Sequence, residues 1–204
     1  WEEVVEKFDS IMSSEIKQTS SKYILMALYH CHKMERIDEI LPFCPKNSVT
    51  VLSILALFLN SKGRKKEALE SIEKAFNILA SNSRGLIKQD QALLDKLIIK
   101  SQQLHEVLEI ILNEDFKMSK KIREKRIEKC PKTYNFYHQI LSISLNMMPI
   151  ESNIKYVLRM LKYALKEQQF HQFYSSLNYL FPDKSKWPAS VAFIHCKSIW
   201  ETGK

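Results

Sequence analysis

Hydrophobic residues recur along most of the chain at intervals of three and four positions, which places them on one face of an α-helix. No segment has the strict apolar–polar alternation of a half-buried β-strand. We therefore predict an all-α protein of about twelve helices joined by short turns. The expected helices cover residues 1–12, 22–32, 37–41, 49–60, 64–79, 86–100, 105–112, 118–129, 134–145, 154–166, 170–181 and 189–200.

Residues that start or stop helices lie between these segments. Ser48 is expected to cap the helix that begins at Val49, and the segment 19–21 offers a cap for the helix that begins at Lys22. Gly63 suits the left-handed position after a helix end, and Pro188 suits the first turn of the last helix. Short connections force neighbouring helices to pack antiparallel, so we predict an α-solenoid of antiparallel helix hairpins.

The composition limits the classes of protein to which the chain can belong. The chain of 204 residues is 45% hydrophobic and 26% charged, which suits one soluble domain over residues 1–204, with a sub-boundary expected near 113–117. Only three glycines are present, and glycine-poor chains are poor candidates for phosphate-binding loops. No apolar run approaches the ~18 residues of a membrane span. The start lacks the pattern of a signal peptide and lacks a Met, so we expect a fragment of a larger intracellular protein, nuclear or cytoplasmic.

The segment 52–80 carries more than periodicity, because small and large apolar residues alternate around a turn glycine. It resembles a tetratricopeptide repeat, and its Gly63–Arg64 turn also resembles a pentatricopeptide repeat. It departs from the tetratricopeptide pattern at Leu52, where that repeat usually has Trp, and at Ala80, where it has Pro. The resemblance implies a diverged array of helical hairpins that bind protein partners. The residues matching the packing positions of the repeat are Leu55, Ala56, Gly63, Ala68, Ile72 and Ala75.

A second, shorter resemblance lies in residues 164–181, which are similar to helix pairs in the helical-repeat subunit of the RNA polymerase I promoter factor. It also implies a subunit of an assembly.

The histidines and cysteines raise the possibility of a zinc site. His30, Cys31 and His32 are adjacent, with Cys44 nearby in sequence. Neighbouring residues on a helix point about 100° apart, so the three cannot face one ion, and a buried Cys31 between partly exposed histidines is favoured. Cys130 precedes a proline in a basic neighbourhood but has no evident His or acidic partner. We predict no enzyme, no catalytic residue, no metal and no cofactor.

The net charge of +8 is concentrated between residues 117 and 132, where eight basic residues face only Glu124 and Glu128. Apart from a narrow apolar strip at Met118 and Ile122, this helix is expected to face outward as a positive surface. Such a surface with neighbouring aromatic rings could bind nucleic acid or an acidic protein; alternatively, the aromatic residues belong to the core. The partner-binding residues predicted here are Lys120, Lys121, Arg123, Lys125, Arg126, Tyr134 and Tyr137.

Trp187 and Trp200 lie near the end of the chain, where they could seal the last helices or mark an interface. The function that we expect is a non-catalytic protein–protein scaffold within an intracellular assembly. The expected concave groove is lined near Leu57, Asn60 and Lys88. The alternatives are a nucleic-acid-binding repeat protein that uses residues 117–137 and a module that self-associates, as a homo- or hetero-oligomer, through the terminal helix.

Overall fold

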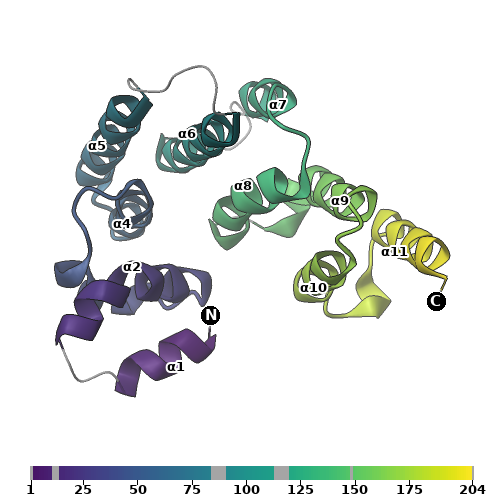
Figure 1. Cartoon of the computed structure of the whole chain (residues 1–204), viewed down its shortest axis with the longest axis horizontal. Coiled ribbons are helices and arrows are strands. Elements are labelled where there is room, and N and C mark those ends of the chain that lie inside the picture. The colour runs from purple at the N-terminus through teal and green to yellow at the C-terminus, as the bar shows by residue number, and fades with distance from the viewer. Residues whose placement is uncertain (1, 11–13, 84–90, 113–119, 148, 204) are drawn as a thin grey trace. The chain divides into compact units, whose positions relative to one another are not determined.

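A computed structural model describes residues 2–10, 14–83, 91–112, 120–147 and 149–203 (Figure 1). In these ranges the chain is helical and has no strand, which confirms the all-α class. No helix within them is both long and apolar enough to cross a membrane. The described residues form eleven α-helices and three short 3₁₀ helices: α1 (Glu2–Ser10), α2 (Ser14–His30), η1 (Met34–Arg36), α3 (Ile37–Ile40), η2 (Leu41–Phe43), α4 (Val49–Ser61), α5 (Lys65–Ser83), α6 (Gln91–Leu112), α7 (Lys120–Glu128), α8 (Tyr134–Met147), α9 (Ile150–Lys166), α10 (Phe170–Leu180), η3 (Lys184–Lys186) and α11 (Ala189–Thr202).

The predicted signals around α4 are confirmed. The Ser48 hydroxyl accepts a hydrogen bond from the Val51 amide at 3.5 Å, as an N-cap does. Gly63 has φ +74°, and the Arg64 amide donates back to the Leu59 carbonyl at 2.9 Å. This pair of features is the Schellman motif, in which a left-handed residue ends the helix and satisfies its last carbonyls.

The same motif ends α2 and α9 without a glycine. His32 and Gln168 each have φ +56°. The amide after His32 donates to the Leu28 carbonyl, and the amide after Gln168 donates to the Ala164 carbonyl. Three helices therefore stop by one mechanism, and only Gly63 was recognisable from the sequence.

Several predicted helix boundaries are wrong. α2 begins at Ser14, so the segment 19–21 lies inside the helix, and Ser21 is buried. α6 is a single helix where a break was expected near 101–104, because Leu104 stays in phase with the apolar face and is fully buried. α9 begins at Ile150, four residues before the expected start, and Pro188 is the N-cap of α11.

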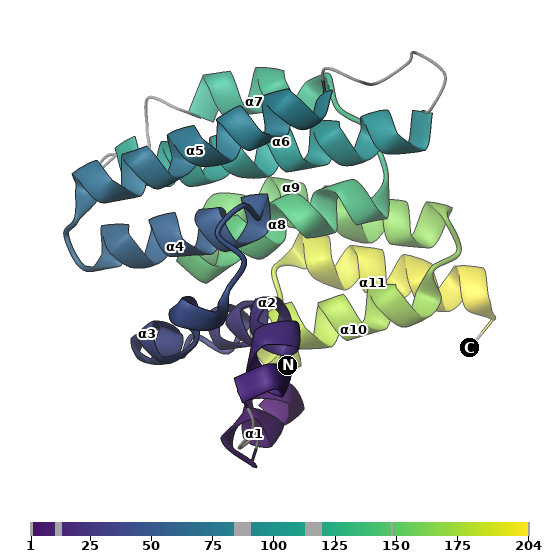
Figure 2. The same cartoon turned by 60° about the vertical axis from the view of Figure 1, so that its left-hand side comes forward.

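The chain divides into two compact units, residues 1–126 and 127–204. The expected sub-boundary near 113–117 lies outside the described residues. In the first unit α4 packs against α5, α6 and α2, and α5 packs against α6; Figure 2 shows α4 and α5 lying side by side lengthwise. α4 is buried on most of its circumference, with Ala56 and Leu57 almost fully enclosed. It is therefore the central helix of this core.

In the second unit the central helix is α9, which packs against α8, α10 and α11. Its core face carries Tyr156, Val157, Met160, Leu161 and Ala164, all buried. The facing helices contribute Phe136 and Phe173, which are fully buried. The opposite face of α9 carries polar side chains, and a basic cleft lies against that face.

Candidate binding surfaces

The basic helix α7 does not present the continuous positive face that was expected. Arg123 is only 5% exposed, and its Nε lies 2.7 Å from Oε2 of Glu106 on α6. Glu106 is itself buried, and burial raises the pKa of this carboxyl while Arg123 opposes that shift. The expectation that Arg123 faces outward is wrong, because a carboxylate on another helix draws it into the core.

Arg126 belongs to the same buried network. Its guanidinium lies 3.1 Å from Glu106 Oε1, pairs with Glu109, and donates a hydrogen bond to Gln102 Oε1 at 2.8 Å. Arg126 is therefore also not part of an outward-facing surface. Hydrogen bonds from an arginine to carboxylates are among the stronger ones in proteins, so the Arg126 bonds and the Arg123 ion pair together hold α7 against α6.

The rest of α7 is split between exposed and undescribed side chains. Ile122, expected to lie in the apolar strip, is 64% exposed, and Lys125 and Lys129 are exposed. Lys120 and Lys121 begin the helix, and their side chains lie outside the described residues. Among the basic residues described here, Lys125 in α7 and Lys129 directly after it thus remain available to a partner.

The aromatic residues that follow α7 are structural. The Tyr134 hydroxyl lies 3.1 Å from Ser176 Oγ, and the Tyr134 amide donates to Glu167 Oε1 at 3.0 Å. The Tyr137 ring is 2% exposed and stacks on Tyr163 with ring centroids 5.6 Å apart. The alternative that these aromatic residues belong to the core is therefore the one that their burial favours.

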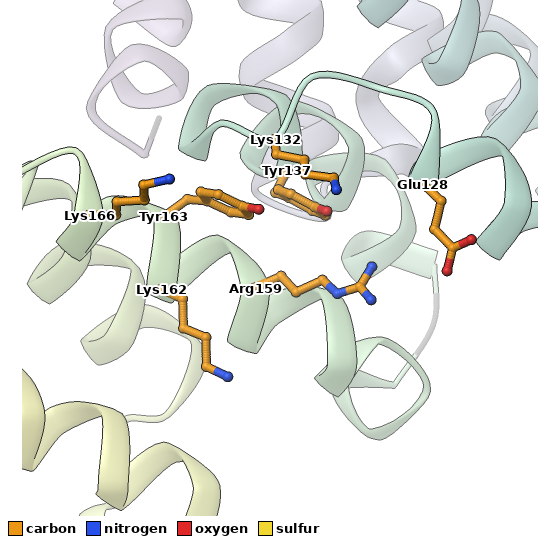
Figure 3. A pocket seen from close by; sticks show the side chains of 7 residues that line it. All are labelled: Glu128, Lys132, Tyr137, Arg159, Lys162, Tyr163 and Lys166. Atoms are coloured by element: carbon orange, nitrogen blue, oxygen red, sulfur yellow. The ribbon is translucent and has the colours of Figure 1, made fainter.

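A basic cleft lies in the second unit, against the polar face of α9 (Figure 3). Its volume is about 610 Å³. Four cationic side chains line it, together with two tyrosines and one carboxylate: Lys132, Arg159, Lys162, Lys166, Tyr137, Tyr163 and Glu128.

The positions of these residues follow from helix geometry. Arg159, Lys162, Tyr163 and Lys166 occupy positions i, i+3, i+4 and i+7 of α9, so they share one face of the helix. This group is less conspicuous in the sequence than the dense run of charges near residue 120, and it was not predicted. The i, i+3, i+7 spacing of the three cations was the signal that could have revealed it.

Positive charge predominates in the basic cleft. Burial raises the pKa of Tyr137, and the positive charge of the nearby Arg159 guanidinium opposes that shift. Among the residues that the structure describes, none of the four cations is within ion-pairing distance of a carboxylate. Four positive charges and one negative charge therefore meet in a space large enough for a ligand.

The two C-terminal tryptophans differ in role. Trp187 is half-buried, donates from Nε1 to the Phe181 carbonyl at 2.8 Å, and meets the edge of the His195 ring. Trp200 is 88% exposed on α11. On the same helix Phe193 is 69% exposed, and Cys196 is also exposed. Since positions 193, 196 and 200 are spaced i, i+3 and i+7, they form one outward-facing strip, which we call the α11 aromatic strip.

The residues that match repeat positions are mostly in the core of the first unit. Ala56, Ala68 and Ala75 are fully buried and Ile72 is 2% exposed, whereas Leu55 is half-buried. Small residues at these positions allow α4 and α5 to approach closely.

Of the residues expected to line the concave groove, Leu57 is 1% exposed. The prediction that it lines a groove is wrong, because it faces the core. Asn60 is half-buried, and Lys88 lies outside the described residues.

The four cysteines differ in how deeply they are buried. Cys31 is half-buried and Cys44 is buried, and burial raises the pKa of the Cys44 thiol against an opposing hydrogen bond with Ser21. Cys130 is also buried. Within the described part of the chain, no group of three His, Cys, Asp or Glu side chains is arranged to hold a metal ion.

The geometry thus gives two surfaces able to meet a partner, the α11 aromatic strip and the basic cleft. The tetratricopeptide resemblance of residues 52–80 stays a prediction that rests on those residues alone. No known family model matches the chain, and no curated protein matches it in sequence.

Proposed function

We propose that this protein is a non-catalytic scaffold that binds another protein inside a larger intracellular assembly. The observation that carries the proposal is the α11 aromatic strip. Trp200 and Phe193 are 88% and 69% exposed, although large aromatic side chains usually lie at least partly buried. Tryptophan is the residue type most enriched where a few side chains supply most of a binding energy.

The strip is not a by-product of a loosely packed helix. The opposite face of α11 is well buried, with Val191 and Ser198 at 0% and Ile194 at 2% exposure. Tyr174 on α10 also reaches α11, with its hydroxyl 3.2 Å from Ser198 Oγ. The helix is therefore held firmly with its aromatic side chains directed to solvent, which suits a preformed interface.

The packing of alternate helices supports the solenoid architecture that we propose for this scaffold. α2 contacts α4, α4 contacts α6, and α9 contacts α11, in addition to the contacts between consecutive helices. In stacked hairpin arrays the first helix of one hairpin packs on the first helix of the next. Such arrays offer extended surfaces to helices and peptides of a partner.

The test is capture of partners from cell extract, followed by reconstitution with the purified partner. Phe193→Ser with Trp200→Ser is expected to weaken binding at least about tenfold. The thermal unfolding midpoint should stay unchanged, because both side chains are already in solvent. Lys184→Ser, which is exposed in the same unit but lies outside α11, is the control and should bind normally. Equal binding by the double variant and the control would refute the role of the strip.

Self-association is the second candidate, because an exposed aromatic strip can also pair with a second copy of the chain. Sedimentation velocity decides between the two. A mass that rises with concentration and reverts to the monomer in the Trp200→Ser variant would support self-association over a separate partner.

The nucleic-acid alternative has less support, because Arg123 and Arg126 are paired with carboxylates and the Tyr134 and Tyr137 rings are buried. Charge reversal at those arginines would test folding instead of binding. The informative variant is Lys125→Glu with Lys129→Glu, since both side chains are exposed. Nucleic-acid binding through this helix predicts affinity that falls steeply with salt and is lost in this variant.

A further inference from the structure

We infer that the basic cleft against α9 binds an acidic peptide segment of a partner protein. This deepens the proposed function by naming the chemistry of a partner, and it rests on that function in choosing a protein as the ligand. The site is separate from the α11 aromatic strip, and its residues belong to the end of α7, the segment between α7 and α8, α8 and α9.

The first argument is charge. Lys132, Arg159, Lys162 and Lys166 bring four positive charges to a cavity of about 610 Å³, with only Glu128 against them. Mutual repulsion among neighbouring cations is unfavourable, and no carboxylate of the described chain relieves it by ion pairing. An anionic ligand would relieve this repulsion, so the cleft selects for negative charge.

The second argument is the distribution of the charges. Arg159 and Lys166 are seven residues apart on α9, a rise of roughly 10 Å. Figure 3 shows the Lys162 and Lys166 side chains leaving the helix in different directions. The cations thus do not converge on one point, as they would around a single phosphate group. Alternate side chains of an extended peptide repeat at roughly 7 Å, so two or three acidic side chains can reach them together.

The third argument favours a peptide over a nucleic acid. Single-stranded nucleic acids are held by aromatic rings that stack on bases. Here the Tyr163 ring stacks on Tyr137 with an angle of 9° between the planes, and Tyr137 is buried. One face of Tyr163 is therefore already covered. Glu128 at the rim would repel a continuous phosphate backbone, whereas a peptide can place an amide or a basic side chain there.

Arg159 is the arginine of the group. Its guanidinium lies 6.0 Å from the centroid of the Tyr156 ring, and the side chain lines the cleft together with Tyr137. A guanidinium can engage a carboxylate with two hydrogen bonds, which gives orientation as well as attraction. Lys162 and Lys166 are exposed and add charge along the cleft.

The experiment measures fluorescence anisotropy of the purified chain with a labelled twelve-residue peptide of alternating Glu and Ala. A Gln–Ala peptide of equal length is the uncharged probe, and a twelve-nucleotide single-stranded RNA is the nucleic-acid probe. The test variant is Lys162→Glu with Lys166→Glu. The control is Lys184→Glu with Lys197→Glu, which changes the net charge equally at exposed sites of the same unit. Lys162→Gln with Lys166→Gln is the milder second variant, and circular dichroism checks that each variant folds.

We expect the acidic peptide to bind, the Gln–Ala peptide to bind at least tenfold more weakly, and the test variant to lose at least tenfold in affinity. The control should lose less than threefold. The inference is overturned if both variants lose affinity equally, if no binding occurs at 0.1 M salt, or if RNA binds more tightly than the peptide through the cleft. If the peptide fails to bind while capture through Trp200 persists, only this inference fails and the proposed function stands.

Discussion

The buried ion pair between Glu106 and Arg123 allows a sharp test of how the first unit is held together. The perturbation is Glu106→Gln, which keeps the shape of the side chain and removes its charge. The two side chains are 4% and 5% exposed, so water cannot replace the lost carboxylate. Arg126 keeps a partner in Glu109, whereas Arg123 loses its buried ion pair with Glu106.

The expected cost follows from this burial. Removing one member of a buried ion pair typically costs about 3–5 kcal/mol, because the other charge stays in a poorly solvated place. We expect about 3 kcal/mol, the lower end, since the Gln oxygen can still accept a hydrogen bond from Arg123. For a unit of this size, that loss lowers the unfolding midpoint by roughly 10 °C.

The assay is urea unfolding followed by far-ultraviolet circular dichroism, with amide hydrogen exchange in α6 and α7 to localise the effect. Glu67→Gln is the matched control, because Glu67 pairs with Arg64 at the surface and should show no measurable change. Glu106→Leu combined with Arg123→Met should recover most of the loss, since the pair is then replaced by apolar groups. A cost below about 1 kcal/mol for Glu106→Gln would refute the reasoning, as would a double variant no more stable than the single one.

Three further outcomes are expected, each measured by chemical unfolding. Gly63→Ala should lower the free energy of unfolding by about 1 kcal/mol, and Gln168→Gly should raise it by a similar amount. Both residues have a left-handed backbone, which is unfavourable for a residue with a Cβ atom and not for glycine. A change of the same sign in both variants would contradict this. Ala75→Leu should cost about 1–3 kcal/mol, since Ala75 is fully buried between packed helices, whereas Ala80→Leu at an exposed position should be tolerated. Burial and the nearby charge of Lys22 lower the pKa of Lys100 in the folded chain. At pH values between this lowered pKa and the ordinary pKa of lysine, the unfolded chain binds more protons than the folded one, so the free energy of unfolding should rise with pH. Lys100→Met should flatten this rise.

The helical class was accessible from sequence because its signals are local. The three- and four-residue spacing fixed helix type, and the Ser48 cap and Gly63 marked the ends of α4 correctly. The ends of α2 and α9 were harder to predict, because His32 and Gln168 adopt a left-handed conformation that their residue types do not indicate. The break expected within α6 failed because polar residues alone, without Gly or Pro, do not interrupt a helix that is packed on one side.

The candidate sites were less accessible because they depend on pairs of helices. Nothing near Arg123 in sequence indicates that Glu106, seventeen positions earlier, neutralises it. A run of basic residues therefore looked like a binding surface, although part of it stabilises the core. The basic cleft shows the opposite case. Its charges are spread along α9 and become a site only where Lys132 and Tyr137 of the neighbouring segments join them.

The packing order of the helices has a consequence for how the chain folds. Nearly all of the principal contacts within each unit join helices that are consecutive or next but one along the chain. Chains whose contacts are close in sequence lose little entropy in closing loops and fold in microseconds to milliseconds. In the α4–α5 hairpin, Gly63 ends α4 and a short turn leads into α5. This hairpin can form as soon as both helices have left the ribosome. The first unit, which ends at Arg126, can then reach its native packing without waiting for the second unit to fold.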